Sequence, residues 1–244
     1  MVDWSVGSHG AQGRSAAGNG ILDALPPADL EQLQPHLEPV SFALNEVLHR
    51  PGDEIAFVYF PVSAVLSCII LLCDGSSIEV GMAGNEGMVG LAALFGDGIS
   101  RHEVMVQGAG AGFRASARVL REAVAKSDAL RDRILKLSQL VLAEISRIAA
   151  CNGRHDLRSR YARWLLQMQD KLVVSRFPVS QELVARLLGV QRTAVNATAL
   201  KLRSDGLIFY RRGRVEILDR AGLEAAACEC HAVMKDLRER FLRG

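Results

Sequence analysis

The clearest hydrophobic pattern in the chain lies between residues 178 and 208, where apolar residues recur three or four positions apart. This spacing places them on one face of a helix, and it occurs twice with an interruption at Gly189. Ser180 precedes the first repeat as an N-cap residue would, and Gly189 follows it where a left-handed C-cap favours glycine. The pattern therefore predicts two short helices joined by a tight turn. The apolar positions are Leu183, Val184, Leu187 and Leu188 in the first helix and Val195, Ala199 and Leu202 in the second.

Two other regions show the short apolar runs that are typical of strands. Residues 207–218 contain two apolar segments around an Arg-Gly turn at 212–213, which predicts a basic two-stranded hairpin. Residues 39–113 contain many short apolar runs separated by Gly, Asp and Asn, which predicts an antiparallel barrel or roll. Within this roll, residues 51–53 and 74–75 are expected turns, the latter as a two-residue hairpin loop.

The longest helical pattern covers residues 128–151 and has two apolar faces. Two such faces exceed what one small roll can cover, so we expect one to pack on the roll and the other on a second copy of the chain. The alternative is a monomer in which the helix is buried intramolecularly. Asn152-Gly153 is expected to break the helix and act as a hinge. The first face carries Leu130, Ile134, Leu137, Val141, Ile148 and Cys151, interrupted by Glu144, and the second carries Leu140, Ile145 and Ala149.

The remaining segments have simpler patterns. Residues 21–38 predict one or two short helices, and residues 116–126 predict another. Residues 155–172 predict an amphipathic helix, and a final helix is expected to begin at Asp219 and to run to the end of the chain. The residues of the 155–172 helix that should face inward are Leu157, Tyr161, Trp164 and Leu165.

The composition is that of a globular protein. The chain has 244 residues, 49% of them apolar, which is enough for one or two domains with a substantial core. No apolar run approaches the length of a bilayer span, and the N-terminus lacks a basic start followed by an apolar stretch. Five irregularly spaced cysteines do not make a disulfide framework, so the cytoplasm is the expected compartment. No phosphate loop, nucleophile elbow or supported pair of catalytic carboxylates indicates an enzyme.

Charge is distributed unevenly, although the formal net charge is only +2. Residues 1–153 hold 11 basic and 17 acidic residues, a net of −6, whereas residues 154–214 hold 13 basic and 4 acidic residues, a net of +9. Residues 215–244 hold 5 basic and 6 acidic residues. A basic block that coincides with the paired helices and the hairpin is expected of a protein that binds a polyanion such as DNA.

The paired helices and the hairpin resemble the helix-turn-helix and wing of the CRP/FNR family of bacterial transcription regulators. The resemblance rests on the order of helix, Gly-Val turn, helix and basic hairpin between residues 178 and 218. Residues 49–53 and 58–64 resemble an early part of the cyclic-nucleotide-binding β-roll, with Ala64 where the family usually has Gly. The alternative for the paired helices is an ordinary helical hairpin within a core.

The resemblance implies an α+β fold with an N-terminal antiparallel β-roll of the cyclic-nucleotide-binding type, a long dimerisation helix and a C-terminal winged helix-turn-helix. It also implies a homodimer that regulates transcription from a pseudo-palindromic site in double-stranded DNA, with RNA polymerase as a further partner. The expected divisions are a disordered tail in 1–20, the β-roll sensor domain with flanking helices in 21–126, the dimerisation helix and hinge in 127–153, and the winged-helix DNA-binding domain in 154–244.

The second helix of the pair offers candidate base contacts at its N-terminal end. The family's reading helix often carries Arg, Glu and a later Arg, and the matching residues here are Arg192, Thr193 and Ala197. A bidentate arginine reads guanine, and small methyl-bearing side chains contact thymine. The candidate base contacts are Gln191, Arg192, Thr193 and Asn196, and the candidate phosphate contacts are Ser180, Gln181, Lys201, Arg211, Arg212 and Arg214. The rival interpretation is a ligand-binding module whose helix pair makes protein contacts only.

The stretch that would hold a cyclic nucleotide departs from the family pattern. Members that bind such ligands carry a Gly-Glu pair and, further along, an Arg followed by Ser or Thr. The matching residues here are Gly90, Leu91, Arg101 and His102, so the glutamate that accepts from the ribose and the small hydroxyl residue are missing. Glu103 is close enough in sequence to compete for Arg101. Because unpaired buried polar groups are costly, we expect that the roll does not bind a standard cyclic mononucleotide; the alternative is a cyclic-nucleotide-responsive regulator.

The cysteines and histidines do not form a complete ligand set along the sequence. Cys68 and Cys73 stand in an expected strand and would point to opposite faces. Cys228 and His231 would share one helix face while Cys230 points elsewhere, and two ligands fall short of a closed zinc site. No metal or cofactor is therefore predicted, and the ligand of the roll is left unassigned. The histidines that a haem could use are His36, His49 and His102, and no pattern supports that use.

Overall fold

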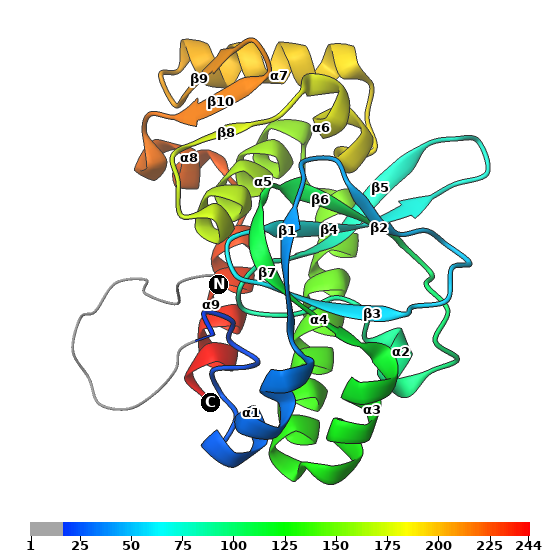
Figure 1. The fold of residues 1–244 in the computed structure, drawn as a ribbon. Helices are drawn as coiled ribbons and strands as arrows, with labels where there is room; N and C mark the ends of the chain where they lie inside the picture. Colours follow the sequence, from blue (N-terminus) through cyan, green and yellow to red (C-terminus); the bar gives the residue numbers. More distant parts are fainter. Residues whose placement is uncertain (1–16) are drawn as a thin grey trace.

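The computed structural model describes residues 17–244, and it confirms the predicted α+β fold. In Figure 1 the C-terminal helix-turn-helix and its small sheet lie at the top, the β-roll lies in the middle, and short helices close the bottom. The long helix α4 runs through the molecule from the bottom toward the helix-turn-helix, with the last helix α9 beside it. None of the helices in the part of the chain that the structure describes is long and apolar enough for a membrane span.

The β-roll consists of two antiparallel sheets, as the alternation of short apolar runs and turns predicts. One sheet has the order β1-β7-β3 and the other has the order β2-β6-β4-β5. The inner faces enclose a small cluster that includes Phe42, Leu66 and Val106. The strands are β1 (Glu38–Phe42), β2 (Val47–His49), β3 (Phe57–Pro61), β4 (Val65–Leu71), β5 (Ser77–Ala83), β6 (Glu103–Gly108) and β7 (Gly110–Ser116).

The turns of the roll lie where the sequence places them, with one difference. Gly52 and Gly75 both have positive φ, at 92° and 82°, which the turns at 51–53 and 74–75 require. The loop between β4 and β5 is longer than the predicted two residues, because Leu72 N donates to Ser76 O across three intervening residues. Cys73 therefore stands in this exposed loop and not in a strand, which corrects the expectation that it faces away from Cys68 within one strand.

Short helices cover the lower end of the roll, in agreement with the predictions for residues 21–38 and 116–126. The packed fold begins before Ile21: Asn19 is fully buried, and its amide donates to Pro61 O and Gly87 O at 2.8 and 2.9 Å. The expected tail thus ends before Asn19, and its residues 1–16 lie outside the described part of the chain. The elements here are α1 (Pro27–Leu33), the 3-10 helix η1 (Gln34–His36), α2 (Ala92–Phe95) and α3 (Ala117–Lys126).

The predicted helix break at Asn152-Gly153 is wrong. Helix α4 (Asp128–Arg154) continues through both residues, and the chain turns at His155 and Asp156 before α5 (Leu157–Leu172) begins. A helical glycine costs only about 1 kcal/mol relative to alanine, and buried Ile148 and Cys151 hold the last turns of α4 in place. The junction instead coincides with the Asp156 side chain, which caps α5 by accepting from Ser159 N at 2.8 Å.

The expected single helix after Asp219 is two helices. Asp219 caps the first, α8 (Arg220–Ala226), as predicted, and accepts from Gly222 N at 2.9 Å. The chain then turns at 227–229, and α9 (Cys230–Arg243) returns along α4. Two contacts fix this return: Arg238 pairs with Glu144 at 2.8 Å, and Arg133 lies 3.8 Å from the Phe241 ring centroid. The turn allows the apolar face of α9 to be buried against α4.

The apolar seam of α4 is covered within a single chain. Leu130, Ile134 and Leu137 join the core of the roll, and Ile148 and Cys151 pack with α9. The first predicted face is therefore covered within the chain, whereas the second face is covered only in part. Of the second face, Leu140 is buried, Ile145 is half-buried and Ala149 is exposed. A different line on α4 carries the exposed large apolar side chains, Leu135 and Leu142, at 52% and 65% exposure.

The roll and the helix-turn-helix share one apolar core. Val65, Ile69 and Met105 of the roll pack in the same cluster as fully buried Tyr161 and Trp164 of α5. Both aromatic residues lie on the inward face predicted for this helix. Burial of this much apolar surface at the boundary means that the two halves are held together by packing and not by a linker alone.

Candidate functional site

The helix-turn-helix has the two helices and the caps that the sequence predicts. They are α6 (Gln181–Leu188) and α7 (Arg192–Ser204). The Ser180 hydroxyl accepts from Leu183 N at 3.1 Å, which satisfies one free N–H of the first turn of α6. Gly189 ends α6 with φ of 63°, where a side chain would be strained and would contact Ile78. Val195, Ala199 and Leu202 are buried, so the opposite face of α7 is directed outward.

The outward face of α7 carries the polar residues that were predicted to read bases. Arg192 has no hydrogen bond or ion pair with any residue of the described chain, so its guanidinium is available to a ligand. Asn196 is paired in part, because its Oδ1 accepts from Gln181 Nε2 at 3.0 Å. That bond ties a candidate base contact to a candidate phosphate contact on α6. The exposed predicted residues on and before α7 are Gln191, Arg192, Thr193, Asn196 and Lys201.

The predicted hairpin forms a wing beside α7. Strands β9 (Ile208–Arg211) and β10 (Arg214–Ile217) are joined by a two-residue turn in which Arg212 and Gly213 have φ of 48° and 73°. Two positive φ values are typical of the type I′ turn, which matches the twist of paired strands. The turn presents the three arginines predicted as phosphate contacts, and all three are exposed: Arg211, Arg212 and Arg214.

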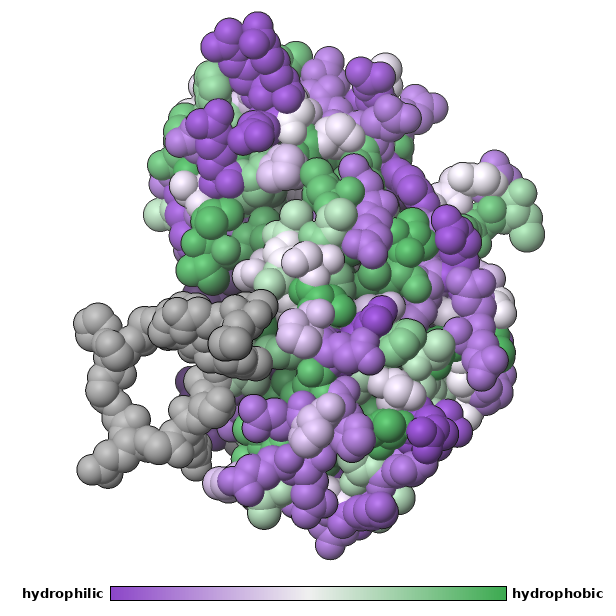
Figure 2. Space-filling view, in the orientation of Figure 1, coloured by the Kyte–Doolittle hydropathy of each residue, from purple (hydrophilic) through white to green (hydrophobic). Residues whose placement is uncertain are grey.

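A fourth arginine of the wing was missed by the sequence analysis. Strand β8 (Arg176–Pro178) pairs with β10 and places Arg176 opposite Glu216. Arg176 then lines one surface hollow together with Arg211, Arg212 and Arg214. The three-residue strand is too short to show alternation, and its proline is unusual in a sheet, so the sequence carried little signal. In Figure 2 hydrophilic side chains gather over this top end of the molecule.

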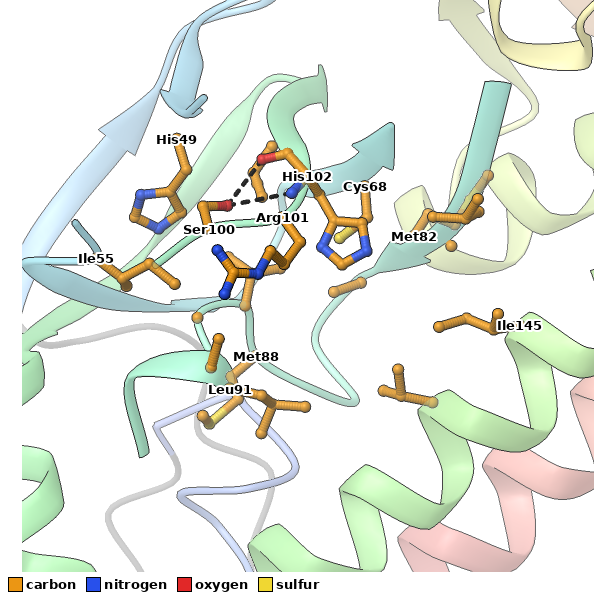
Figure 3. A pocket seen from close by; sticks show the side chains of 18 of the residues that line it. His49, Ile55, Cys68, Met82, Met88, Leu91, Ser100, Arg101, His102 and Ile145 are labelled. Carbon is orange, nitrogen blue, oxygen red and sulfur yellow. Dashed lines mark hydrogen bonds between the residues drawn. The ribbon is translucent and has the colours of Figure 1, made fainter. Parts of the chain in front are cut away.

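A cavity of about 230 Å³ lies between the roll and α4 (Figure 3). All four residues predicted for ligand binding line it: Gly90, Leu91, Arg101 and His102. Most of the other lining residues are apolar, and several were not predicted, among them Met82, Met88, Val141 and Ile145. Val141 and Ile145 belong to α4, so an occupant of the cavity would touch the long helix directly.

The charged groups at the cavity pair differently from the prediction. Arg101 bonds Asp97 and not Glu103, and 64% of its side chain is exposed. Glu103 instead pairs with Arg186 of α6 at 2.6 Å, which ties the roll to the helix-turn-helix. The expectation that Glu103 competes for Arg101 is therefore wrong. Gly90 has φ of 106°, and a Cβ at this position would come within 3.2 Å of the Val58 side chain, so both the backbone and the close packing favour glycine.

The titratable groups around the cavity are mostly uncharged at neutral pH. Burial lowers the pKa of both His49 and His102, and it raises the pKa of Cys68 to about 12. His36, the third histidine considered for haem, lies at the end of η1 and does not line this cavity. The cavity therefore offers neutral imidazoles and apolar surface together with the exposed guanidinium of Arg101 and the carboxyl group of Glu144.

Two buried ion pairs join the roll and α4 to α5 and α9. Glu144 lines the cavity and accepts from Arg238 of α9, and Glu86 bonds Lys171 of α5. Burial would raise the pKa of Glu86, but the charges of Lys171 and Arg238 bring it below its ordinary value. For Glu144 burial dominates and raises the pKa. The two pairs influence one another, and together they join α4, α5, α9 and the loop after β5.

The C-terminal cysteines lie in an arrangement that differs from the sequence prediction. Cys228 precedes α9, and the His231 ring turns away to lie 2.9 Å from Asp170 on α5. Cys228 and His231 therefore do not share a ligand face. Cys228 and Cys230 point instead toward the end of α4, where the Cys228 Sγ lies 3.5 Å from the Cys151 Sγ.

Residues 159–226 match the family described as a Crp-like helix-turn-helix domain. The whole fold is similar to that of FixK2 from Bradyrhizobium japonicum, with 17% identity, a TM-score of 0.67 and coverage of 79% of this chain and 98% of that one. It is also similar to TTHB099, a transcriptional regulator of the CRP family from Thermus thermophilus, with 24% identity, a TM-score of 0.65 and coverage of 77% and 96%.

A third similar structure is that of the c-di-GMP responsive global regulator CLP from Xanthomonas campestris. It is 24% identical, has a TM-score of 0.63, and the match covers 80% of this chain and 100% of that one. At these identities the likeness establishes the fold. A comparison with curated protein sequences found no significant match.

Proposed function

We propose that this chain, which carries a Crp-like helix-turn-helix domain on a fold shared with CRP/FNR regulators, is a sequence-specific DNA-binding transcription regulator that acts as a homodimer. The observation that carries the proposal is the exposed N-terminal face of α7, where Arg192 makes no hydrogen bond or ion pair within the described chain, beside a wing with four arginines. A helix that is anchored by its apolar face and polar on the other can enter a major groove.

The charged residues of this surface divide into two roles. Arg192 and Thr193 lie in the first turn of α7, where side chains reach base edges, and Arg192 is suited to a bidentate contact with guanine. The wing arginines and Lys201 provide sequence-independent contacts with phosphates, and we add Arg176 to this set. Gln181 bonds Asn196, so these two side chains act as one unit at the groove.

Homodimerisation is supported by the outer surface of α4. Leu135 and Leu142 are exposed and stand seven residues apart, and exposed Ala149 extends the line by another seven. A repeat of seven brings apolar residues to one seam between two helices that pack along each other. The dimer would place two copies of α7 on successive major grooves of a pseudo-palindromic site. RNA polymerase stays an expected partner on the basis of the family resemblance.

The dimer seam can be tested by charge substitution. Leu142→Glu places a carboxylate on each helix at the seam, and we expect the chain to become monomeric in sedimentation velocity and to lose DNA affinity. Leu72→Glu is a matched control, because Leu72 is similarly exposed, at 53%, but lies in the loop after β4. If Leu142→Glu formed dimers as stable as those of the parent, α4 would not form the dimer interface.

The sensor ligand is proposed not to be a standard cyclic mononucleotide. Leu91 offers no acceptor for a ribose hydroxyl, and Arg101 is already paired with Asp97. Both features disfavour a sugar phosphate and leave a cavity suited to a less polar ligand. Isothermal calorimetry with cyclic AMP and cyclic GMP tests this, and we expect no sub-millimolar binding of either. Tight binding of one would instead support the alternative of a cyclic-nucleotide-responsive regulator.

We propose that occupancy of the cavity reaches the DNA-binding surface through α4 and the buried ion pairs. Glu144 touches both the cavity and Arg238, and Lys171 belongs to the helix that supports the helix-turn-helix core. A ligand that displaces Val141 or Glu144 would shift α4 against α5 and α9. A ligand can move such an equilibrium only by its differential affinity for the two arrangements.

Selection of bound sites from a random DNA pool tests the central proposal. We expect an enriched sequence with two inverted half-sites and an affinity that falls steeply as salt rises. Enrichment in the presence and absence of small molecules from a cell extract would also reveal whether the cavity ligand is required. A chain that binds no DNA at low salt under either condition would favour the rival function, a ligand-binding module whose helix pair contacts protein.

A further inference from the structure

The last turn of α4 and the turn between α8 and α9 bring together three thiols and one imidazole. Cys151 lies in the last turn of α4 and His155 directly follows that helix, whereas Cys228 lies in the turn before α9 and Cys230 is the first residue of α9. One ligand atom from each residue lies within 4.8 Å of the other three. We propose that these four residues form a tetrahedral binding site for Zn²⁺. The proposal does not depend on the proposed function, and it uses none of the DNA-contacting residues.

The spacing of the ligand atoms matches a zinc tetrahedron. Zn–S bonds of about 2.3 Å give a tetrahedron whose edges are about 3.8 Å. The Cys151 and Cys228 sulfurs are 3.5 Å apart, and the Cys230 sulfur is 3.8 Å from the His155 Nδ1. An ion at the centre therefore needs only small side-chain movements. Three thiolates and one imidazole are a common ligand set of structural zinc sites.

The two nitrogens of His155 have separate roles. Nδ1 faces Cys230 and the cluster, while Nε2 lies 3.2 Å from the Glu229 carboxylate. When a histidine binds a metal through one nitrogen, the other usually donates to a carboxylate or carbonyl, which fixes the ring and its tautomer. Glu229 stands between the two cysteines in sequence and provides that acceptor. A chance contact among thiols would not require this orientation.

The charge around the cluster also favours an anionic site. Arg160 and Arg163 of α5 are buried within electrostatic range of the cysteines. Among residues 17–244 neither has a carboxylate at ion-pair distance; Arg160 donates to Leu188 O and Arg163 to Gln167 Oε1, and Arg163 also lies within range of Glu79. Buried guanidiniums need nearby negative charge. Three thiolates around Zn²⁺ leave one net negative charge, which these arginines offset.

The competing chemistry for the same atoms is a disulfide between Cys151 and Cys228. A disulfide would use two of the four groups, and it would leave Cys230 and the oriented His155 ring without a role. Zinc binding uses all four, and it releases the thiol protons to solvent without a change of oxidation state. His155 keeps 25% of its side chain exposed, which gives an ion a route to the site.

The location gives the site a structural consequence. Its ligands tie the end of α4 to the start of α9, directly beside the turn at 155–156 where α5 begins. Bound Zn²⁺ would therefore hold the junction between the long helix and the helix-turn-helix. An ion that binds only the folded chain also raises the free energy of unfolding.

The direct test uses the full-length reduced protein with Zn²⁺ and Co²⁺ as probes. We expect one Zn²⁺ per chain by mass spectrometry, and a lower thermal midpoint after chelation. Co²⁺ should give the visible d–d bands of tetrahedral coordination together with a thiolate charge-transfer band in the near ultraviolet. No tetrahedral cobalt spectrum in the reduced protein would overturn the proposal, as would a native mass two hydrogens lighter with no metal bound.

Variants then assign the ligands. Cys228→Ser should weaken Zn²⁺ binding more than Glu229→Gln, for which we expect about a 10–100-fold loss because only the orientation of His155 is affected. Cys230→His should keep the tetrahedral d–d bands and reduce the charge transfer by the share of one thiolate, which shows that a folded variant still coordinates. Cys73→Ser is the matched control, because Cys73 is exposed in the loop between β4 and β5, and this variant should bind Zn²⁺ as tightly as the parent does. Equal losses in Cys73→Ser and Cys228→Ser would contradict the assignment.

Discussion

The helix-turn-helix and the junction beneath it, where α4, α5 and α9 meet, are organised by contacts of very different range. In the helix-turn-helix the cap joins Ser180 to Leu183, and Gly189 ends α6 with a positive φ. At the junction the bonded partners are 85 residues apart for Lys171 and Glu86, 94 for Arg238 and Glu144, and 77 for Cys151 and Cys228. The surface for recognition is thus built locally, whereas the part that would transmit a signal is built from distant segments.

The difference has an energetic side. Removal of an exposed polar residue of α7 should leave the fold intact, because the helix is anchored through its buried face. Removal of one partner from a buried pair at the junction leaves a charge without compensation in an apolar environment. We therefore expect substitutions in the first region to change recognition and those in the second to change stability.

The largest effect is expected for Arg238→Ala. Its side chain is 8% exposed and bonds Glu144, so the variant should lose about 3–5 kcal/mol in the free energy of unfolding, measured by urea denaturation. Arg240→Ala is the control on the same helix, because Arg240 is 71% exposed and should change stability by less than about 1 kcal/mol. The double variant Arg238→Met with Glu144→Leu should regain most of the loss. Equal losses in the free energy of unfolding for Arg238→Ala and Arg240→Ala would contradict the expectation that buried pairs at the junction determine stability.

The next effect concerns the pH dependence of stability at Glu79, which belongs to β5 and lies near Arg163 of α5. Burial raises the pKa of Glu79 to about 7, although Ser67 and Arg163 favour the carboxylate. Between about pH 4.5, the pKa of this carboxyl group in the unfolded chain, and about pH 7, its pKa in the folded chain, the folded chain binds a proton that the unfolded chain has released. The free energy of unfolding therefore falls as pH rises through this window. Glu79→Gln removes this loss, on the order of 1–3 kcal/mol. The difference in the free energy of unfolding between the Glu79→Gln variant and the parent should therefore be more favourable to the variant at pH 8 than at pH 5.

Denaturation at both pH values checks the Glu79 prediction. Glu122→Gln is a suitable control, because Glu122 is 54% exposed and pairs only within its own helix. A parent and a Glu79→Gln variant whose stabilities run parallel from pH 5 to pH 8 would show that Glu79 titrates normally.

In the helix-turn-helix and its wing, substitution of Arg192 and substitution of Arg212 should have different effects on DNA binding. Arg192→Ala should cost about 1–3 kcal/mol on the selected site by relaxing one base pair, while binding to random DNA changes little. Arg212→Ala should weaken binding to all sequences and reduce the slope of log affinity against log salt by about 1. Fluorescence anisotropy on specific and random duplexes over a salt series measures both. Equal losses on the two duplexes for Arg192→Ala would show that it contacts phosphate.

The smallest effect is expected for Ser180→Ala. Loss of the cap on α6 should cost about 1 kcal/mol of stability and, because Ser180 is also a candidate phosphate contact, a modest part of the DNA affinity. Ser41→Ala is the control, because Ser41 is exposed in β1, a strand outside the helix-turn-helix, and the substitution should change neither quantity. An unchanged thermal midpoint for Ser180→Ala would show that the cap adds nothing to this fold.

Prediction from sequence succeeded where the governing interaction is short in range. The periodicity of Val195, Ala199 and Leu202 identified α7, and the Arg-Gly pair identified the wing turn, because each pattern is complete within a few residues. It failed at Asn152-Gly153, where a weak local preference is overruled by packing of the preceding turn. Arg176 escaped notice because a three-residue strand has no pattern of its own.

The amino-acid sequence alone determined helix α7, the alternating strands of the roll and the uneven charge that places a basic block in the half of the chain that holds the helix-turn-helix. Tertiary structure alone decided that α9 covers α4, that Arg101 pairs with Asp97, and that two turns far apart in the chain combine their cysteines with His155. The physical reason is the range of the interactions. Helical periodicity and turn chemistry act between neighbours, whereas a four-ligand cluster or a buried ion pair exists only after the chain has brought its distant parts together.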